Sequence, residues 1–153
     1  METRSCLFCG APLRRTFVDL GMHPLCESYV SEAKLNAMEP FYPLHVYVCE
    51  RCFLVQLHEY VSPADIFTEY AYFSSYADSW VQHAKRYTEM IEERLKLTAK
   101  SLVVELASND GYLLQHFVAK GIPVLGIEPA ANVAEAARKK NVPTLVKFFG
   151  RNT

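Results

Sequence analysis

Residues 102–114 decide the fold, and they read Leu102-Val103-Val104-Glu105-Leu106-Ala107-Ser108-Asn109-Asp110-Gly111-Tyr112-Leu113-Leu114. An apolar strand over 102–106 runs into a tight polar turn, and a helix is expected over 112–120. The same alternation continues through a second strand, a second helix and a third strand, at 124–127, 130–140 and 144–146. Such alternation predicts an α/β fold with a parallel sheet and crossover helices.

The turn after the first strand is the candidate ligand loop, because ligands of open α/β sheets bind outside the carboxyl ends of the strands. Its residues are Ala107, Ser108, Asn109, Asp110 and Gly111. Glu128 ends the second strand and follows Gly111 by 17 residues, close to the spacing at which an acid reaches ribose hydroxyls. Ala107 stands where a dinucleotide fingerprint has its first glycine, which disfavours a dinucleotide. Asp110 would repel a phosphate, so the loop favours S-adenosylmethionine. The alternative, an ordinary turn punctuated by Asn-Asp-Gly, stays open.

The stretch before this sheet is expected to be helical. Ser62 and Pro63 form a helix start, and a longer helix is expected after Asp78 or Ser79. Its apolar stripe, predicted to face the core, is Trp80, Ala84, Tyr87, Ile91 and Leu95. The tyrosine-rich run between the two helices contains Tyr70 and Tyr72, which either line a substrate pocket or plug a domain joint.

Two Cys-x-x-Cys pairs near the start predict a zinc site. The pairs are Cys6 with Cys9 and Cys49 with Cys52, and four thiolates at this spacing complete a tetrahedron with no open position. The metal is therefore expected to be structural, and buried thiols or a redox pair are the alternative. Cys26 is interpreted as a small, partly buried side chain. The lone histidines His23, His45 and His58 are also left out of the site.

Short strand signals at 16–20, 44–48 and 53–57 surround the cysteine pairs, as in a zinc ribbon. The apolar core of such a segment is small, so metal binding should stabilise it. The predicted domains are thus a zinc-binding module at 1–60, a helical joint at 61–99 and an incomplete cofactor-binding domain at 100–153.

Composition excludes some partners. The net charge is −1 and the pI about 6.5, which argues against a nucleic-acid surface. The sequence has no apolar run long enough to span a bilayer and no signal-peptide pattern at its start. Together with reduced thiols kept for a metal, these features predict a soluble, cytoplasmic protein.

The order of these motifs resembles a zinc-containing group of class I methyltransferases. The shared stretches are Cys-x-x-Cys-Gly, 20–25, Cys49-x-x-Cys52, 55–57, 70–75, 108–113 and 126–130. The whole chain resembles the N-terminal part of a nucleotide-deoxysugar C-methyltransferase. The resemblance implies a Rossmann-like sheet and methyl transfer from S-adenosylmethionine to a carbon beside the keto group of a nucleotide-linked sugar. It assigns zinc to the four paired cysteines, the cofactor to 107–111 with Glu128, and the reacting centre to Tyr70 and Tyr72.

In that family a His/Tyr/Glu base motif lies beyond the part that this chain resembles. The chain alone is therefore expected to transfer no methyl group, and to self-associate through the exposed edge of the strand at 102–106. The alternative function is a non-enzymatic zinc-binding or partner-binding protein that retains the beginning of a methyltransferase.

Overall fold

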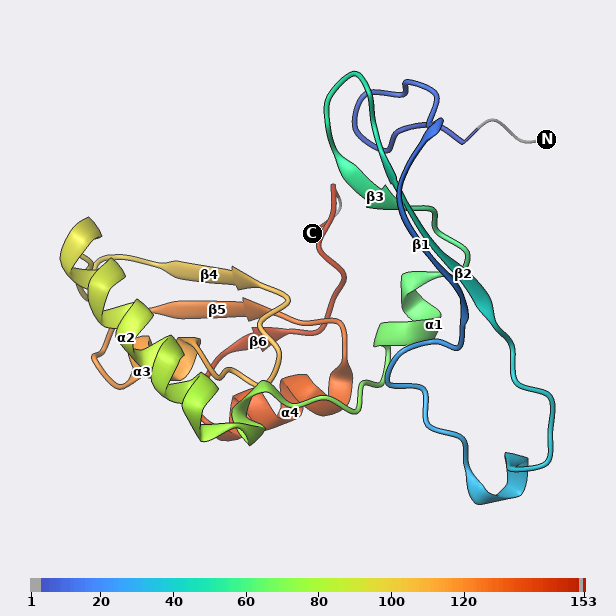
Figure 1. The fold of residues 1–153 in the computed structure, drawn as a ribbon. Coiled ribbons are helices and arrows are strands. Elements are labelled where there is room, and N and C mark those ends of the chain that lie inside the picture. The colour runs from blue at the N-terminus through green and yellow to red at the C-terminus, as the bar shows by residue number, and fades with distance from the viewer. Residues whose placement is uncertain (1–3, 152) are drawn as a thin grey trace. The chain divides into compact units, whose positions relative to one another are not determined.

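The computed structural model describes residues 4–151 and 153 and has an α/β fold (Figure 1). The chain separates into two compact units, Met1–Ser62 and Pro63–Thr153, each with its own sheet. The predicted division into three domains at 1–60, 61–99 and 100–153 stays a prediction. None of the helices in the described part of the chain is long and apolar enough to cross a membrane.

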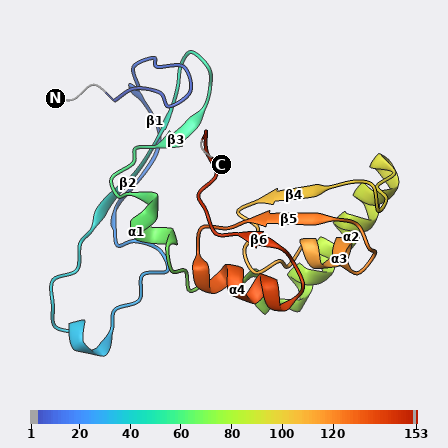
Figure 2. The same cartoon turned by 180° about the vertical axis from the view of Figure 1, so that it is seen from behind.

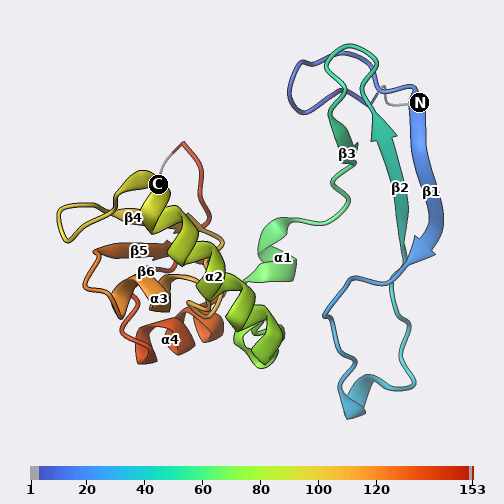
Figure 3. The ribbon, with the colours of Figure 1, turned by 60° about the vertical axis from the view of Figure 1, so that its left-hand side comes forward.

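The first unit is built on an antiparallel sheet in the order β1-β2-β3 (Figure 3). Its strands are β1 (Arg15–His23), β2 (Tyr42–Val48) and β3 (Val55–Leu57), and the short 3-10 helix η1 (Glu32–Lys34) lies between β1 and β2. The pairing of β1 with β2 shifts register twice, between Thr16 and Val18 and between Asp19 and Met22. The first strand is thus longer than the predicted 16–20, because pairing resumes after each shift.

The second unit contains a parallel sheet in the order β4-β5-β6 (Figure 2). Its elements are α1 (Pro63–Phe67), η2 (Ser74–Tyr76), α2 (Asp78–Leu95), β4 (Val103–Leu106), α3 (Leu114–Val118), β5 (Val124–Ile127), α4 (Ala131–Lys139) and β6 (Thr144–Leu145). Among the described strands, β4 pairs only with β5 and so forms one edge. This order is expected for three strands of a doubly wound sheet, while the Rossmann-like assignment itself stays a prediction.

Three helices and the sheet share one apolar core. The fully or nearly buried members are Leu114, Phe117, Ile122, Val124, Ala137 and Val142. Ile91 of α2 and Val103 of β4 pack against this cluster. Since side chains alternate along a strand, Val104 and Leu106 point the opposite way from Val103, and both are exposed. The helices therefore cover the face of β4 that carries Val103 and Glu105.

The predicted apolar stripe of the long helix is partly wrong. Ala84 is buried and Ile91 packs on the core, but Trp80, Tyr87 and Leu95 are exposed. The buried line includes Thr88 in their place, and Thr88 has no exposed surface. A hydroxyl can be buried here because Thr88 Oγ1 donates to the carbonyl of Lys85 at 2.7 Å, within the helix itself.

Candidate functional site

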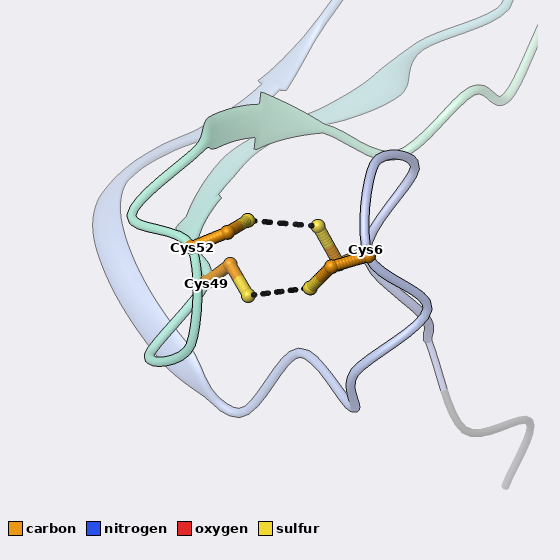
Figure 4. A group of neighbouring side chains, drawn as sticks. Cys6, Cys49 and Cys52 are labelled. Atoms are coloured by element: carbon orange, nitrogen blue, oxygen red, sulfur yellow. Dashed lines mark hydrogen bonds between the residues drawn. The ribbon is translucent and has the colours of Figure 1, made fainter.

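Four cysteine thiols meet at the end of the first unit, as the spacing predicts. The sulfur atoms of Cys6, Cys9, Cys49 and Cys52 all lie within 4.8 Å of one another. Cys6 Sγ is 3.6 Å from Cys52 Sγ, and Cys9 Sγ is 3.6 Å from Cys49 Sγ, so each contact joins the two pairs (Figure 4). Four converging sulfurs are the donor set of a structural zinc site, and these residues fit that ion.

The two cysteine pairs sit on turns with the same backbone pattern. The N–H of Gly10 donates to the carbonyl of Cys6 at 3.0 Å, and the N–H of Phe53 donates to the carbonyl of Cys49 at 2.9 Å. Both donor residues have a left-handed backbone, with φ of +70° at Gly10 and +62° at Phe53. Glycine adopts this conformation without strain, whereas phenylalanine does not. The second turn therefore carries a local cost that the first avoids.

Hydrogen bonds to sulfur favour the charged form of two thiols. The pKa of Cys6 is lowered to about 6, chiefly because Gln56 Nε2 donates to its sulfur at 3.2 Å. Gln56 is itself held, since its Oε1 accepts the N–H of Leu7 at 2.8 Å. The backbone N–H groups of Cys52 and Arg51 lower the pKa of Cys49. Thiolates are the form that binds a metal, so these hydrogen bonds favour the metal-binding form of Cys6 and Cys49.

The side chains left out of the zinc site lie elsewhere in the first unit. Among the described residues, the group of possible metal ligands consists of the four paired cysteines. His45 stacks on Tyr47, with 4.2 Å between ring centroids, and its Nε2 lies 2.8 Å from Thr16 Oγ1. The expectation that Cys26 is partly buried is wrong, because Cys26 is exposed. It lies in the long connection between β1 and β2, where little packs against it.

A pocket of about 370 Å³ opens at the carboxyl ends of β4 and β5. Its lining is mainly apolar and aromatic: Pro63, Phe67, Tyr70, Leu106, Ala107, Asn109, Ile127, Glu128, Pro129, Lys147, Phe148 and Phe149. Four of the predicted ligand-site residues are in this lining, namely Ala107, Asn109, Glu128 and Tyr70. Residues far apart in sequence are thus brought to one cavity, at the place where an open α/β sheet binds ligands.

Glu128 joins the two strand ends beneath this pocket. The side chain is only 6% exposed, and both of its oxygens accept backbone hydrogen bonds. Oε2 accepts the N–H of Asn109 and Oε1 accepts the N–H of Ala130, each at 2.9 Å. A buried carboxylate held this way fixes the loop after β4 against the end of β5. Glu128 is therefore a structural residue of the loop as well as part of the pocket wall.

The other predicted loop residues, Ser108, Asp110 and Gly111, are absent from the pocket lining and pack inside the unit. Ser108 is fully buried, and a Cβ added at Gly126 would overlap its hydroxyl. Asp110 forms an ion pair with Lys140 at 3.0 Å. A Cβ at Gly111 would lie 3.0 Å from Val142, so this glycine permits close packing.

Tyr72 is also absent from the pocket lining, and its side chain is exposed. Tyr70 lines the pocket, whereas Tyr72 meets the loop through its backbone: Asn109 Nδ2 donates to the carbonyl of Tyr72 at 3.2 Å. The roles of all the candidate site residues in binding or chemistry stay predictions.

Residues other than glycine adopt left-handed backbone conformations in the loop at 107–111. Ala107, Asn109 and Gly111 have φ of +55°, +48° and +75°, so alternate residues adopt the left-handed region. Asparagine tolerates this region better than most residues, whereas alanine is strained there. The loop thus has a backbone that usually requires glycine. Local strain of this kind is often found at functional sites.

Sequence reasoning missed Glu105, which lies in β4 on the face covered by helices. Burial raises its pKa to about 7, and the nearby carboxylate of Glu128 contributes to the rise. Its Oε2 is buried and has no hydrogen-bond partner among residues 4–151 and 153. The pKa of Tyr112 is raised too, by burial first and then by Glu105. A carboxylate in the middle of an apolar strand was the available signal.

Two comparisons with known proteins show what the chain is similar to. Residues 6–67 match a family model described as "Putative zinc binding domain". Over 144 residues the chain is 35% identical to the C-methyltransferase NovU of Streptomyces niveus. That match covers 94% of this chain and 34% of the relative, so the chain spans about a third of the length of the curated relative it matches. The expected resemblance is confirmed by these two matches.

Proposed function

We propose that this chain belongs to the zinc-containing C-methyltransferase family and that its second unit binds S-adenosylmethionine. The observation that carries the proposal is the pocket at the carboxyl ends of β4 and β5. Its lining includes Ala107, Asn109 and Glu128, three residues whose sequence positions predict a cofactor site. The cavity of about 370 Å³ lies within the usual size range of small-molecule sites.

The chemistry of the pocket suits an adenosyl ligand. Phe67, Tyr70 and Phe149 provide aromatic surface for a flat ring. Glu128 provides the acceptor for ribose hydroxyls, since each carboxylate oxygen can accept more than one hydrogen bond. When bound, S-adenosylmethionine supplies an electrophilic methyl group. The residues of this chain bind the cofactor, orient it and exclude water from it.

The first unit is proposed to hold one structural zinc ion. All four ligand positions are filled by thiols, which leaves none for a substrate. For the whole protein, we propose methyl transfer to a carbon of a nucleotide-linked keto-deoxysugar, as the family resemblance implies. The substrate class is then a small molecule.

Calorimetric titration of the chain with S-adenosylmethionine and with S-adenosylhomocysteine tests the proposal. Glu128→Ala should weaken binding by about 1.5 to 3 kcal/mol, the value of a hydrogen bond to a charged group. Glu128→Gln is a second variant that keeps the shape of the side chain. Glu135→Gln is the matched control, because Glu135 is exposed and forms an ion pair with Lys139, away from the pocket lining. Unchanged affinity in both Glu128 variants would refute the assignment.

A second candidate function is partner binding without catalysis. The connection between β1 and β2 exposes large apolar side chains, including Tyr29, Leu35 and Met38. Such surfaces often mark interaction sites. If the wild-type chain binds neither adenosyl ligand while keeping its zinc, this second candidate is favoured over the first.

A further inference from the structure

The backbone of the tyrosine-rich segment is held by side chains rather than by a strand. Asn132, in the first turn of α4, satisfies both backbone groups of Tyr70. Its Oδ1 accepts the N–H of Tyr70 at 3.1 Å, and its Nδ2 donates to the carbonyl of Tyr70 at 2.7 Å. One amide side chain thus replaces the two bonds that a neighbouring strand would supply. Tyr70 and Asn132 are 62 residues apart in sequence.

The candidate ligand loop holds the next part of the same segment. Asn109 Oδ1 accepts the N–H of Ser74 at 2.8 Å, and Asp110 Oδ2 accepts the N–H of Ser75 at 3.2 Å. The segment 70–75 is therefore attached to the start of α4 at one end and to the loop after β4 at the other. We call this segment the tyrosine strap.

The strap reaches the pocket through Tyr70. Tyr70 lines the cavity beside Phe67, with 5.4 Å between the two ring centroids, and Asn109 lines the same cavity. The position of the Tyr70 ring depends on its backbone, which Asn132 fixes at both polar groups. Aspartate lacks the donor and alanine lacks both groups, so asparagine suits this position through its paired donor and acceptor.

We propose that Asn132 is a positioning residue that sets Tyr70 as a wall of the pocket and thereby determines the affinity for the adenosyl ligand. The identity of the ligand rests on the proposed function. The two hydrogen bonds between Asn132 and the Tyr70 backbone, which we call the clamp, do not depend on it. Asn132 itself is absent from the pocket lining. Its effect on binding must therefore act through the aromatic ring that it positions.

Amide hydrogen exchange, followed by NMR on the whole chain without ligand, tests the clamp. Asn132→Ala should speed exchange of the Tyr70 amide about fivefold or more, since its acceptor is lost. Asn132→Asp keeps an acceptor and should protect that amide better than alanine does. Glu135→Ala, an exposed change on the same helix, should leave it unaltered. An Asn132→Ala chain with wild-type exchange at Tyr70 would overturn the proposal.

A double-mutant cycle tests the effect on the ligand. Asn132→Ala should weaken binding of S-adenosylhomocysteine about fivefold or more in the wild-type background, and should change it less than twofold in a Tyr70→Ala background. Equal losses in the two backgrounds would show that Asn132 does not act through Tyr70, and would sink the proposal. If the wild-type chain binds no ligand, the proposed function fails, and the exchange experiment alone decides the clamp.

Discussion

Replacing Glu128 should destabilise the second unit, because the carboxylate is buried and accepts two backbone hydrogen bonds. A hydrogen bond to a charged group contributes about 1.5 to 3 kcal/mol. Glu128→Ala leaves the N–H groups of Asn109 and Ala130 without this acceptor, so we expect a loss of about 3 to 6 kcal/mol. Glu128→Gln keeps one acceptor oxygen and should lose about half as much.

Urea unfolding followed by tryptophan fluorescence measures this loss in the correct unit. Trp80 is the sole tryptophan of the chain, and it lies in α2 of the second unit. Its ring stacks on that of Tyr112, with 6.0 Å between centroids, so unfolding should change its emission. Glu135→Gln is the control and should stay within about 0.5 kcal/mol of wild type. A Glu128→Gln variant equally close to wild type would refute the structural role.

The nearby Glu105 adds a test that depends on pH. Burial raises the pKa of Glu105 to about 7, so below pH 7 this side chain is mostly protonated. A protonated carboxyl group carries no charge and therefore repels Glu128 only weakly. At pH 8 Glu105 is mostly charged and repels the side chain of Glu128, so Glu128→Gln also relieves this repulsion. The stability loss of Glu128→Gln should therefore be smaller at pH 8 than at pH 6, by roughly 1 kcal/mol. A larger loss at pH 8 would contradict this account.

Four further predictions follow from the same structure. Chelation of zinc should unfold the first unit, since structural zinc contributes about 10 to 16 kcal/mol of folding free energy in small domains. Circular dichroism should show the loss of structure while Trp80 fluorescence stays constant, and an unchanged spectrum after metal removal would contradict this prediction. Phe53→Gly should stabilise the turn at Cys49–Phe53 by about 1 kcal/mol, because Phe53 has φ of +62° and its side chain is 76% exposed. Gly10→Ala should destabilise the corresponding turn at Cys6–Gly10, and competition with a zinc chelator measures both effects. Burial raises the pKa of Glu105 to about 7, so the folded state holds the proton of Glu105 more tightly than the unfolded state does. The free energy of unfolding should therefore fall by about 1 to 3 kcal/mol as the pH rises from about 4.5 to above 7. Glu105→Gln should flatten this pH profile in urea titrations. The chain is also expected to self-associate through the edge of β4, since unpaired strand edges seek partners, and a monodisperse monomer in sedimentation experiments would show otherwise.

Local spacing was enough to predict the cluster of four cysteines and the order of most strands and helices. Two residues separated by a fixed short turn have nearly fixed geometry, so Cys6 with Cys9 and Cys49 with Cys52 could be paired without knowing the fold. Alternation of strands and helices likewise follows from periods of two and 3.6 residues. The polar turn after the first strand also had a local signature, and three of its positions took the left-handed backbone.

The roles within that turn were decided by tertiary structure. Sequence treated 107–111 as one ligand loop, but Ser108 and Asp110 became buried packing residues while Ala107 and Asn109 reached the pocket. The apolar stripe of α2 was predicted only in part, because the helical period alone does not show that Thr88 is buried while Trp80 and Tyr87 are exposed. Asn132 gave no signal at all, because its bond to Tyr70 joins residues that no local period relates. Short-range sequence patterns fix distances within a turn, whereas contacts between distant segments depend on how the whole unit packs.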